Sequence, residues 1–220
     1  MKTLTPGLLL RRLAIGSALT VVLAACSVLG TSGSGPTKSQ TRTVETFTRV
    51  ETGDGISVSV HIGPVQAVEV TAQENILPLV ATTVEAGVLK IRSIQSYSTS
   101  EGIEATVTVG ALDGISLSGG SHGQIDGLAA DHLDITASGG AIVSARGTTS
   151  DLTLSASGGA RADLEDLLTK KIRLDLSGGS TAALQASGQV TGSVSGGALA
   201  TVGGGATINA QTSGGTVTSK

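Results

Sequence analysis

Polar and apolar residues alternate along the first half of the chain, a pattern typical of β-strands that bury one face. The alternation is clearest in four segments, at 56–61, 68–71, 89–92 and 103–109. Turn-forming residues separate these segments at 53–55, 63–64 and 85–87. Residues 74–78 are the one stretch that favours a helical turn, which Pro78 would limit. The first half is therefore predicted to be a series of short strands.

The second half repeats the tripeptide Ser-Gly-Gly at intervals of 18 to 20 residues. The serines of its six copies are Ser118, Ser138, Ser157, Ser177, Ser195 and Ser213. Apolar or small residues recur one, three and five positions before the serines, and three, five and seven positions after them. Each repeat thus predicts two short strands that meet at a glycine corner and bury the same face. Stacked repeats of this kind form an all-β, parallel β-solenoid (β-helix) with about 18–20 residues per coil.

Glycine at each corner allows the positive φ angle of a chain reversal, and the serine is expected to satisfy nearby backbone. Gly158→Val should therefore strain a corner, and Leu154→Asp should place an unpaired carboxylate inside the stack. Smaller or polar residues take the inner positions near the C-terminus: Gly192, Ala210, Thr212, Thr216 and Thr218. The last coil would leave a bare sheet edge, open to its own tail, another subunit or a different partner.

Composition supports a thin core of stacked aliphatic side chains. Phe47 and Tyr97 are the only aromatic residues, and the 32 glycines mostly follow the repeat, so they indicate turns and not disorder. Without the three basic residues of the leading segment, 11 Lys and Arg residues face 17 Asp and Glu residues, a net charge of −6. No basic patch is interleaved with aromatic residues, so nucleic acid is not expected as a partner.

The first 26 residues follow the order of a bacterial lipoprotein signal. Lys2, Arg11 and Arg12 precede an apolar run at 13–23, which is short for a membrane span. The run leads into Leu23-Ala24-Ala25-Cys26, which resembles a lipobox. We predict a signal peptide at 1–25 and a lipid anchor on Cys26. An ordinary signal peptide and an uncleaved anchor are the alternatives.

The remaining chain divides by composition. Residues 26–43 are rich in Gly, Ser and Thr and are predicted to be a flexible tether. The folded domain is expected at 44–220, with less regular strands at 44–110 and the Ser-Gly-Gly repeats at 111–220. Because Cys26 is the only cysteine, neither an internal disulfide nor a cysteine metal cluster can form.

From residue 44 onward the chain resembles a known family. The resemblance rests on segments 55–60, 68–72, 74–78 and 84–91, in that order, followed by the Ser-Gly-Gly series. The family is the auto-transporter adhesin head GIN domain, a bacterial domain of unknown function. Ser57 stands where the family name implies asparagine. The resemblance implies a right-handed solenoid-like fold, often on exported lipoproteins, and it carries over no catalytic residues because the family has none established.

Few residues suggest chemistry. The titratable candidates are His61, His122, His132, Asp126, Asp131 and Asp134. They show no recognisable catalytic or metal-ligand spacing, so we interpret them as solvated side chains. The outward positions bring Asp134, Arg173 and Asp175 within two predicted coils, where they could serve polysaccharide cleavage; a solvated face of mixed charge is the favoured interpretation. No acid recurs after the corners, so calcium is not expected, and no cofactor or metal site is predicted.

These features indicate a lipid-anchored protein of the cell envelope that binds or adheres without catalysis. Its expected partners are the membrane, through the anchor, and a glycan or an envelope protein. The alternatives are a carbohydrate-active enzyme, as a lyase or hydrolase on the same scaffold, and a purely structural component. Ser27 follows the cysteine in place of the aspartate typical of inner-membrane retention, which favours the outer membrane or cell surface and leaves the inner membrane open. The oligomeric state and the cover of the last coil stay undetermined.

Overall fold

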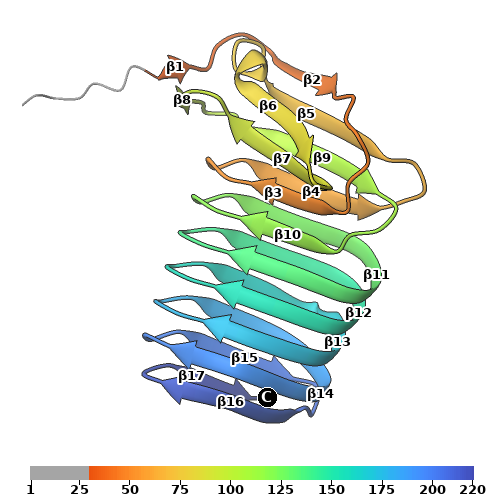
Figure 1. Cartoon of the computed structure of the whole chain (residues 1–220). Helices are drawn as coiled ribbons and strands as arrows, with labels where there is room; N and C mark the ends of the chain where they lie inside the picture. The colour runs from red at the N-terminus through yellow and green to blue at the C-terminus, as the bar shows by residue number, and fades with distance from the viewer. Residues whose placement is uncertain (1–29) are drawn as a thin grey trace, which may run out of the picture.

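Each Ser-Gly-Gly corner joins two faces of an elongated stack of β-coils in the computed structural model, which describes residues 30–220 (Figure 1). Strands that lead into the corners make up the incoming face, and strands that leave the corners make up the outgoing face. Successive coils of the repeat pair in parallel. The all-β solenoid predicted from the repeat is therefore confirmed.

The strands of the stack alternate between these faces. The incoming face includes β3 (Arg49–Thr52), β10 (Gly114–Leu117) and β16 (Thr207–Ser213). The outgoing face includes β4 (Ser57–Ile62), β15 (Leu199–Gly203) and β17 (Thr216–Ser219). Four long strands run from the outgoing to the incoming face: β11 (His122–Ala137), β12 (Ile142–Ala156), β13 (Arg161–Leu176) and β14 (Thr181–Ser195). Their midpoints, at 126–131, 146–150, 165–170 and 185–188, form a third side that we call the bend side.

The predicted inner positions stack in columns. On the incoming face, Ile115, Ile135, Leu154 and Leu174 are register partners in successive coils, and each is at most 1 % exposed. A single coil has only two short strands, so it buries these side chains only against the coils above and below. The resulting core is one continuous cluster that extends from Phe47 to Val202.

The corners are tight turns stacked backbone on backbone. The first glycine of every Ser-Gly-Gly has a positive φ, for example +70° at Gly158. A Cβ on Gly158 would lie 3.0 Å from the carbonyl oxygen of Gly139, which supports the expected strain in Gly158→Val. The corner serines mainly bond through their backbone, as when the N–H of Ser138 donates to the oxygen of Leu117 at 3.0 Å. The hydroxyl of Ser121, three residues after a corner serine, donates to the oxygen of Ser118 at 2.8 Å.

The N-terminal end is built out of chain order. β7 (Val88–Ser93) pairs in parallel with β3, and β9 (Glu104–Val109) pairs in parallel with β4. A coil made by later residues therefore lies outside the coil of β3 and β4. Antiparallel strands cover this outer coil, as β5 (Ala67–Gln73) pairs with β9 and β6 (Val80–Glu85) pairs with β7. The 3₁₀ helix η1 (Leu77–Leu79) lies between them, with Pro78 near its start and not at its end as the sequence suggested.

The described part of the predicted tether is held against this end. β2 (Thr37–Thr41) pairs antiparallel with β5, and β1 (Thr31–Ser32) pairs with β8 (Tyr97–Ser98). The side chain of Asn75 also bonds the leading segment, accepting from the N–H of Ser34 and donating to the oxygen of Ser32, each at 2.7 Å. Polar composition suggested flexibility here, but β2 needs no buried face because its backbone satisfies the edge of β5.

The last coil differs from the predicted columns by one residue. Val217 lies opposite Ala200, and Thr216 and Thr218 are exposed, although the repeat spacing predicted the two threonines to face inward. The corner before β17 is tighter, with an isolated bridge between Ser195 and Gly214. A one-residue slip reverses the facing of every side chain in a strand, and here it turns the apolar Val217 inward.

Candidate functional site: a groove along the bend side

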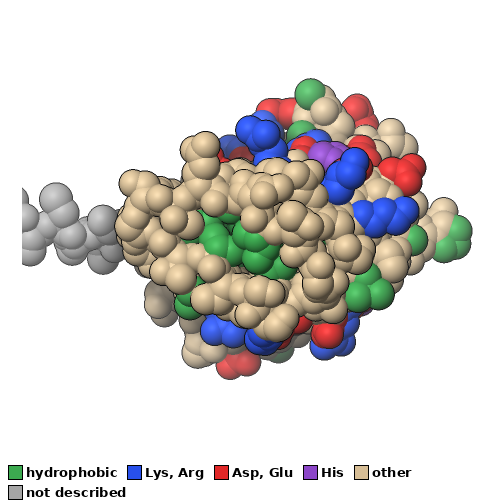
Figure 2. All heavy atoms as spheres, turned by 90° about the horizontal axis from the view of Figure 1, so that it is seen from below, with side chains coloured by type: hydrophobic (Ala, Val, Ile, Leu, Met, Phe, Trp, Pro, Cys, Tyr) green, Lys and Arg blue, Asp and Glu red, His purple; other side chains and the backbone are tan. Residues whose placement is uncertain are grey.

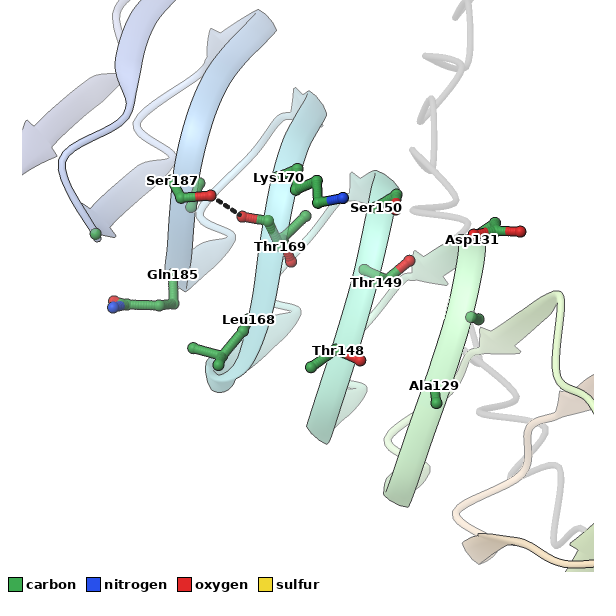
Figure 3. Close-up of a pocket in the computed structure, with 13 residues that line it drawn as sticks. Ala129, Asp131, Thr148, Thr149, Ser150, Leu168, Thr169, Lys170, Gln185 and Ser187 are labelled. Atoms are coloured by element: carbon green, nitrogen blue, oxygen red, sulfur yellow. Dashed lines mark hydrogen bonds between the residues drawn. The ribbon is translucent and has the colours of Figure 1, made fainter.

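A hollow of about 620 Å³ runs along the bend side, across strands β11 to β14. Figure 3 shows its lining as three rows, each with one side chain per coil. The first row is Ala129, Thr148, Leu168 and Gln185, which are register partners. The second row is Ala130, Thr149, Thr169 and Ala186, also register partners. The third row is Asp131, Ser150, Lys170 and Ser187.

The rows arise where the long strands bend. Pairing of β11 with β12 shifts register between Ile125 and Leu128, and pairing of β12 with β13 shifts between Ser144 and Gly147. Gly147 has a φ of +132°, and a Cβ there would lie 2.1 Å from the oxygen of Leu128. Past the bend the strands return to register for the first two rows, and between β13 and β14 the register shifts again at the third row, between Thr169 and Lys171.

Hydrogen bonds to the backbone hold the hydroxyl groups in the middle of the groove. Thr149 and Thr169 are each only 4 % exposed. The hydroxyl of Thr149 donates to the oxygen of Asp151 at 3.3 Å, and that of Thr169 donates to the oxygen of Leu167 at 3.2 Å. Ser187 donates to the oxygen of Thr169 at 3.4 Å, the dashed line of Figure 3. Ser187 is exposed, so its hydroxyl oxygen keeps a lone pair available to a ligand, whereas the hydroxyls of Thr149 and Thr169 serve the buried backbone.

The rest of the lining is small and weakly charged. Leu168 is 57 % exposed, and alanines lie at both ends of the second row. Asp131 and Lys170 give the lining one charge of each sign. The groove thus offers methyl groups, hydroxyls, one acid and one base, which is an arrangement for contact along an extended chain.

The structure separates Asp134 from the other two outward candidates. Asp134 Oδ2 accepts from Arg49 at 2.8 Å, and His132 Nε2 lies 2.7 Å from its Oδ1. Burial alone would raise the pKa of the Asp134 carboxyl, but hydrogen bonds and charge from Arg49 and His132 hold that pKa below its usual value. Thr153 stands between Asp134 and Arg173 in the register, so those two positions are about 10 Å apart.

Arg173 and Asp175 do share a shallow hollow of about 410 Å³ on the incoming face. Asp175 Oδ1 accepts from the hydroxyl of Ser193 at 3.1 Å. Asn209 and Gln211 complete the lining on the side of the last coil. This is a polar surface with one acid and one base.

The other titratable candidates lie apart. His61 and Asp126 are neighbours in register, and Asp126 accepts from Gln124 at 2.7 Å. His122 is exposed on the outgoing face, and Asp131 lies in the groove. Within residues 30–220, His132 is the only histidine whose ring is hydrogen-bonded, and no cluster of three or more His, Cys, Asp or Glu could hold a metal ion.

Sequence reasoning did not find the groove. Its rows come from consecutive residues at the bend, which lie outside the repeat positions that the corners define. The repeats can also be aligned on the residues of the bend in place of the corner serine. That alignment places Ala130, Thr149, Thr169 and Ala186 in one column.

The predicted lipidation site, Cys26, lies outside the described residues. Over the described range 30–220, no helix has the length and apolar character needed to cross a membrane.

The comparisons place the chain in a family. Residues 46–206 match the sequence model of the family described as "Putative auto-transporter adhesin, head GIN domain". The chain belongs to this family. The resemblance stated from the sequence is thereby confirmed. No functionally curated protein matches the chain.

Solved structures of similar proteins show the same fold. A "putative adhesin" from Bacteroides fragilis is 18 % identical, with 87 % of this chain and 99 % of that chain covered and a TM-score of 0.67. A "putative adhesin" from Parabacteroides distasonis is 17 % identical, with 87 % and 100 % covered and a TM-score of 0.64. A "putative lipid binding protein" from the same species is 13 % identical, with 86 % and 98 % covered and a TM-score of 0.59.

Proposed function

We propose that this GIN-domain protein is a lipid-anchored module of the cell envelope that binds an extended polymer, a glycan or a protein segment, along its bend-side groove and catalyses no reaction. The observation that carries the proposal is the row formed by Ala129, Thr148, Leu168 and Gln185, which are register partners across four coils and line one hollow. The family's description as an adhesin head agrees with a role in attachment.

The spacing of the rows suits a polymer. Neighbouring coils are about 4.8 Å apart, so four coils present equivalent contacts over about 15 Å. Tight protein interfaces rely on Trp, Tyr and Arg, and none of these lines the groove. Each contact is therefore weak, and useful affinity requires several contacts along one ligand or many copies of the protein on one surface.

The same lining argues against hydrolysis. Glycoside hydrolysis uses two carboxyl groups on either side of the bond that is cleaved. The groove lining contains Asp131 alone, and the Arg173 hollow contains Asp175 alone. Asp134, the remaining outward carboxyl group, is hydrogen-bonded to Arg49 and His132.

Binding to the groove is tested by substitutions that place larger or charged side chains in it. The full chain and the variant Thr148→Arg/Leu168→Asp are compared on a glycan array and in a pull-down from envelope extracts. The variant should lose at least about tenfold in affinity, since it blocks the first row in two adjacent coils. The matched control Thr153→Arg adds charge to the incoming face and should bind as the parent does. Equal binding by both variants contradicts the groove, and a glycan-cleaving activity lost in an Asp134, Arg173 and Asp175 triple variant favours the enzyme.

The anchor has a separate test. Cells that express the chain are fed a labelled fatty acid, and the label should appear on the protein and be lost in Cys26→Ala. Label that persists in Cys26→Ala rules out the lipidated cysteine. Fractionation of the labelled cells then assigns the membrane or surface on which the protein lies.

A further inference from the structure

The two ends of the stack are finished differently. At the N-terminal end, the η1 segment covers the core with the buried Ile76 and Leu77, and the outer strand edges belong to β2, which contains Lys38, and to β6, which ends at Glu85. At the C-terminal end, β16 pairs only with β14, and β17 pairs only with β15. Within residues 30–220, no strand pairs with the outer edge of either one. The last coil therefore presents two unpaired strand edges side by side.

These edges carry free backbone donors. The N–H of Thr216 donates to the oxygen of Ala198, and the N–H of Lys220 donates to the oxygen of Val202, both at 2.9 Å. Donors alternate along a strand, so the N–H groups of Val217 and Ser219 point away from β15, toward the open end. Unpaired backbone groups of this kind are templates for pairing with another strand.

The strands of the open end also lack charge, and Lys220, which follows β17, pairs with Glu165. No Asp, Glu, Lys or Arg occurs from Leu176 to Ser219. Figure 2 shows hydrophobic side chains in the middle of this end, with uncharged side chains and backbone directly around them and charged side chains farther out. Ile208, Ala210 and Val217 are half-buried there, since they have a coil on only one side. Natural proteins usually protect a free edge with lysine, proline or a bulge, and β16 contains neither lysine nor proline.

We propose that the last coil, Thr207–Ser219, is a docking surface for the same coil of a second copy of this protein. A two-fold axis places each edge antiparallel to an edge of the other copy, and the half-buried Ile208, Ala210 and Val217 of both copies complete one core. An uncharged surface fits its own copy without repulsion, whereas a charged one does not. The edge strands at the N-terminal end, β2 and β6, carry Lys38 and Glu85 and do not match the uncharged strands β16 and β17, so association stops at a dimer and does not build a fibre.

The size of the surface predicts a weak dimer. A seven-residue strand is about 23 Å long and two packed sheets are about 20 Å across with their side chains, so each copy covers about 500 Å². The total of about 1,000 Å² is at the lower limit of specific interfaces. Dimerisation should therefore depend on concentration, as expected for copies crowded on a surface. The proposal does not depend on the polymer groove.

The test measures mass as a function of concentration. The full chain carrying Cys26→Ala, which prevents both lipidation and an intermolecular disulfide, is followed by sedimentation over about a hundredfold range of concentration. We expect a shift from one mass to twice that mass. Asn209→Lys/Gln211→Lys, which places like charges at the two-fold contact, should stay monomeric. The control Thr153→Lys/Ser155→Lys changes the same two outward rows three coils away and should dimerise as the parent does.

Hydrogen exchange gives a readout that needs no variant. The amides of Val217 and Ser219 should become at least about tenfold slower to exchange at the high concentration, while Gly87 in the β6–β7 turn should not change. A parent chain that stays monomeric throughout, a dimer that survives Asn209→Lys/Gln211→Lys, or growth beyond a dimer each overturns the proposal.

Discussion

The N-terminal and C-terminal parts of the stack reach stability by different means. The N-terminal part breaks the order of the chain: β7 and β9, which follow β3 and β4 in sequence, precede them in space, and antiparallel strands then cover the outer coil. The C-terminal part adds one coil after another in register and ends without a cover in the described residues. Regular repeats can extend a solenoid, but ending one requires sequence that departs from the repeat.

The N-terminal and C-terminal parts also differ in how many charged residues they carry. In the N-terminal part, ion pairs join different strands: Arg92 pairs with Glu51, and Lys90 pairs with Glu85. The coils after Asp175 contain no charged residue before Lys220, which pairs back to Glu165 at 2.5 Å. Exposed ion pairs contribute little to stability. The apolar columns must therefore provide most of the stability in both parts.

Leu154→Asp should have the largest effect. Leu154 is fully buried between Ile135 and Leu174, so the new carboxylate would lie in the stack without a partner. We expect a loss of more than about 4 kcal/mol in the free energy of unfolding, or no folded protein. The same change at Ile208, in the half-buried last coil, should cost about 1 kcal/mol. Urea unfolding of both variants is the measurement, and equal losses would show that the last coil is as tightly packed as the middle.

Gly178→Ala should have the next largest effect. Gly178 has a φ of +68°, and its Cβ would lie 2.9 Å from the backbone oxygen of Gly158. The left-handed conformation and the contact together should cost about 3 kcal/mol. Gly214 has a φ of +73°, but its Cβ would meet nothing closer than 3.9 Å, so Gly214→Ala should cost about 1 kcal/mol.

Thermal unfolding of the two variants separates conformation from packing. If both alanine variants lose the same stability, the cost comes from φ alone and the stacked corners contribute nothing. A smaller loss in Gly178→Ala than in Gly214→Ala would contradict the close stacking of corners.

The columns could be predicted because every coil repeats one environment. Residues at a fixed distance from the corner serine face the same neighbours in each coil, so sequence spacing alone placed Leu154 and Ala162 in the core. The order of the first coils could not be predicted, because local alternation does not show which strands pair. Arg49 and Asp134 are 85 residues apart, and only the pairing of β3 with β10 and β10 with β11 brings them together.

The groove and the last coil were missed for a related reason. Their positions depend on how many residues each bend or corner contains. β11 and β13 have 16 residues where β12 and β14 have 15, and the register shifts absorb the difference. The corner before Val217 is one residue shorter, which reverses the expected facing of Thr216 and Thr218. Spacing counted from the corner serine cannot show such a local deletion.

Asn75→Ala should loosen the leading segment without affecting the stack. Asn75 makes two hydrogen bonds, to Ser32 and Ser34, and each contributes about 1 kcal/mol. Amide exchange at 31–35 should therefore rise at least about tenfold, while global unfolding changes little. The control is Lys38→Ala, which removes an exposed ion pair with Glu74 and should change exchange by less than about threefold. Unchanged exchange in Asn75→Ala would mean that β1 and β2 pairing alone hold the segment.

Asp134→Asn should have the smallest effect, and one that depends on pH. The Asp134 carboxyl has a lowered pKa in the folded protein because Arg49 and His132 stabilise its charge, so it contributes stability above its unfolded pKa of about 3.9. That contribution is lost as the pH falls through the folded value. The parent should be more stable than Asp134→Asn by about 1 kcal/mol or less at pH 7, and the difference should vanish in acid.

Melting temperatures of the parent and Asp134→Asn between pH 7 and pH 2 test this dependence, and Arg49→Met identifies its source. Arg49 reaches Asp134 from β3, so the ion pair joins the first coil in sequence to β11. In an Arg49→Met background, Asp134→Asn should have a smaller effect at pH 7, because one of the groups that lower the pKa is gone. An undiminished effect there would assign the contribution to His132 alone, and the ion pair would then add nothing to the contact between the N-terminal coils and the repeat.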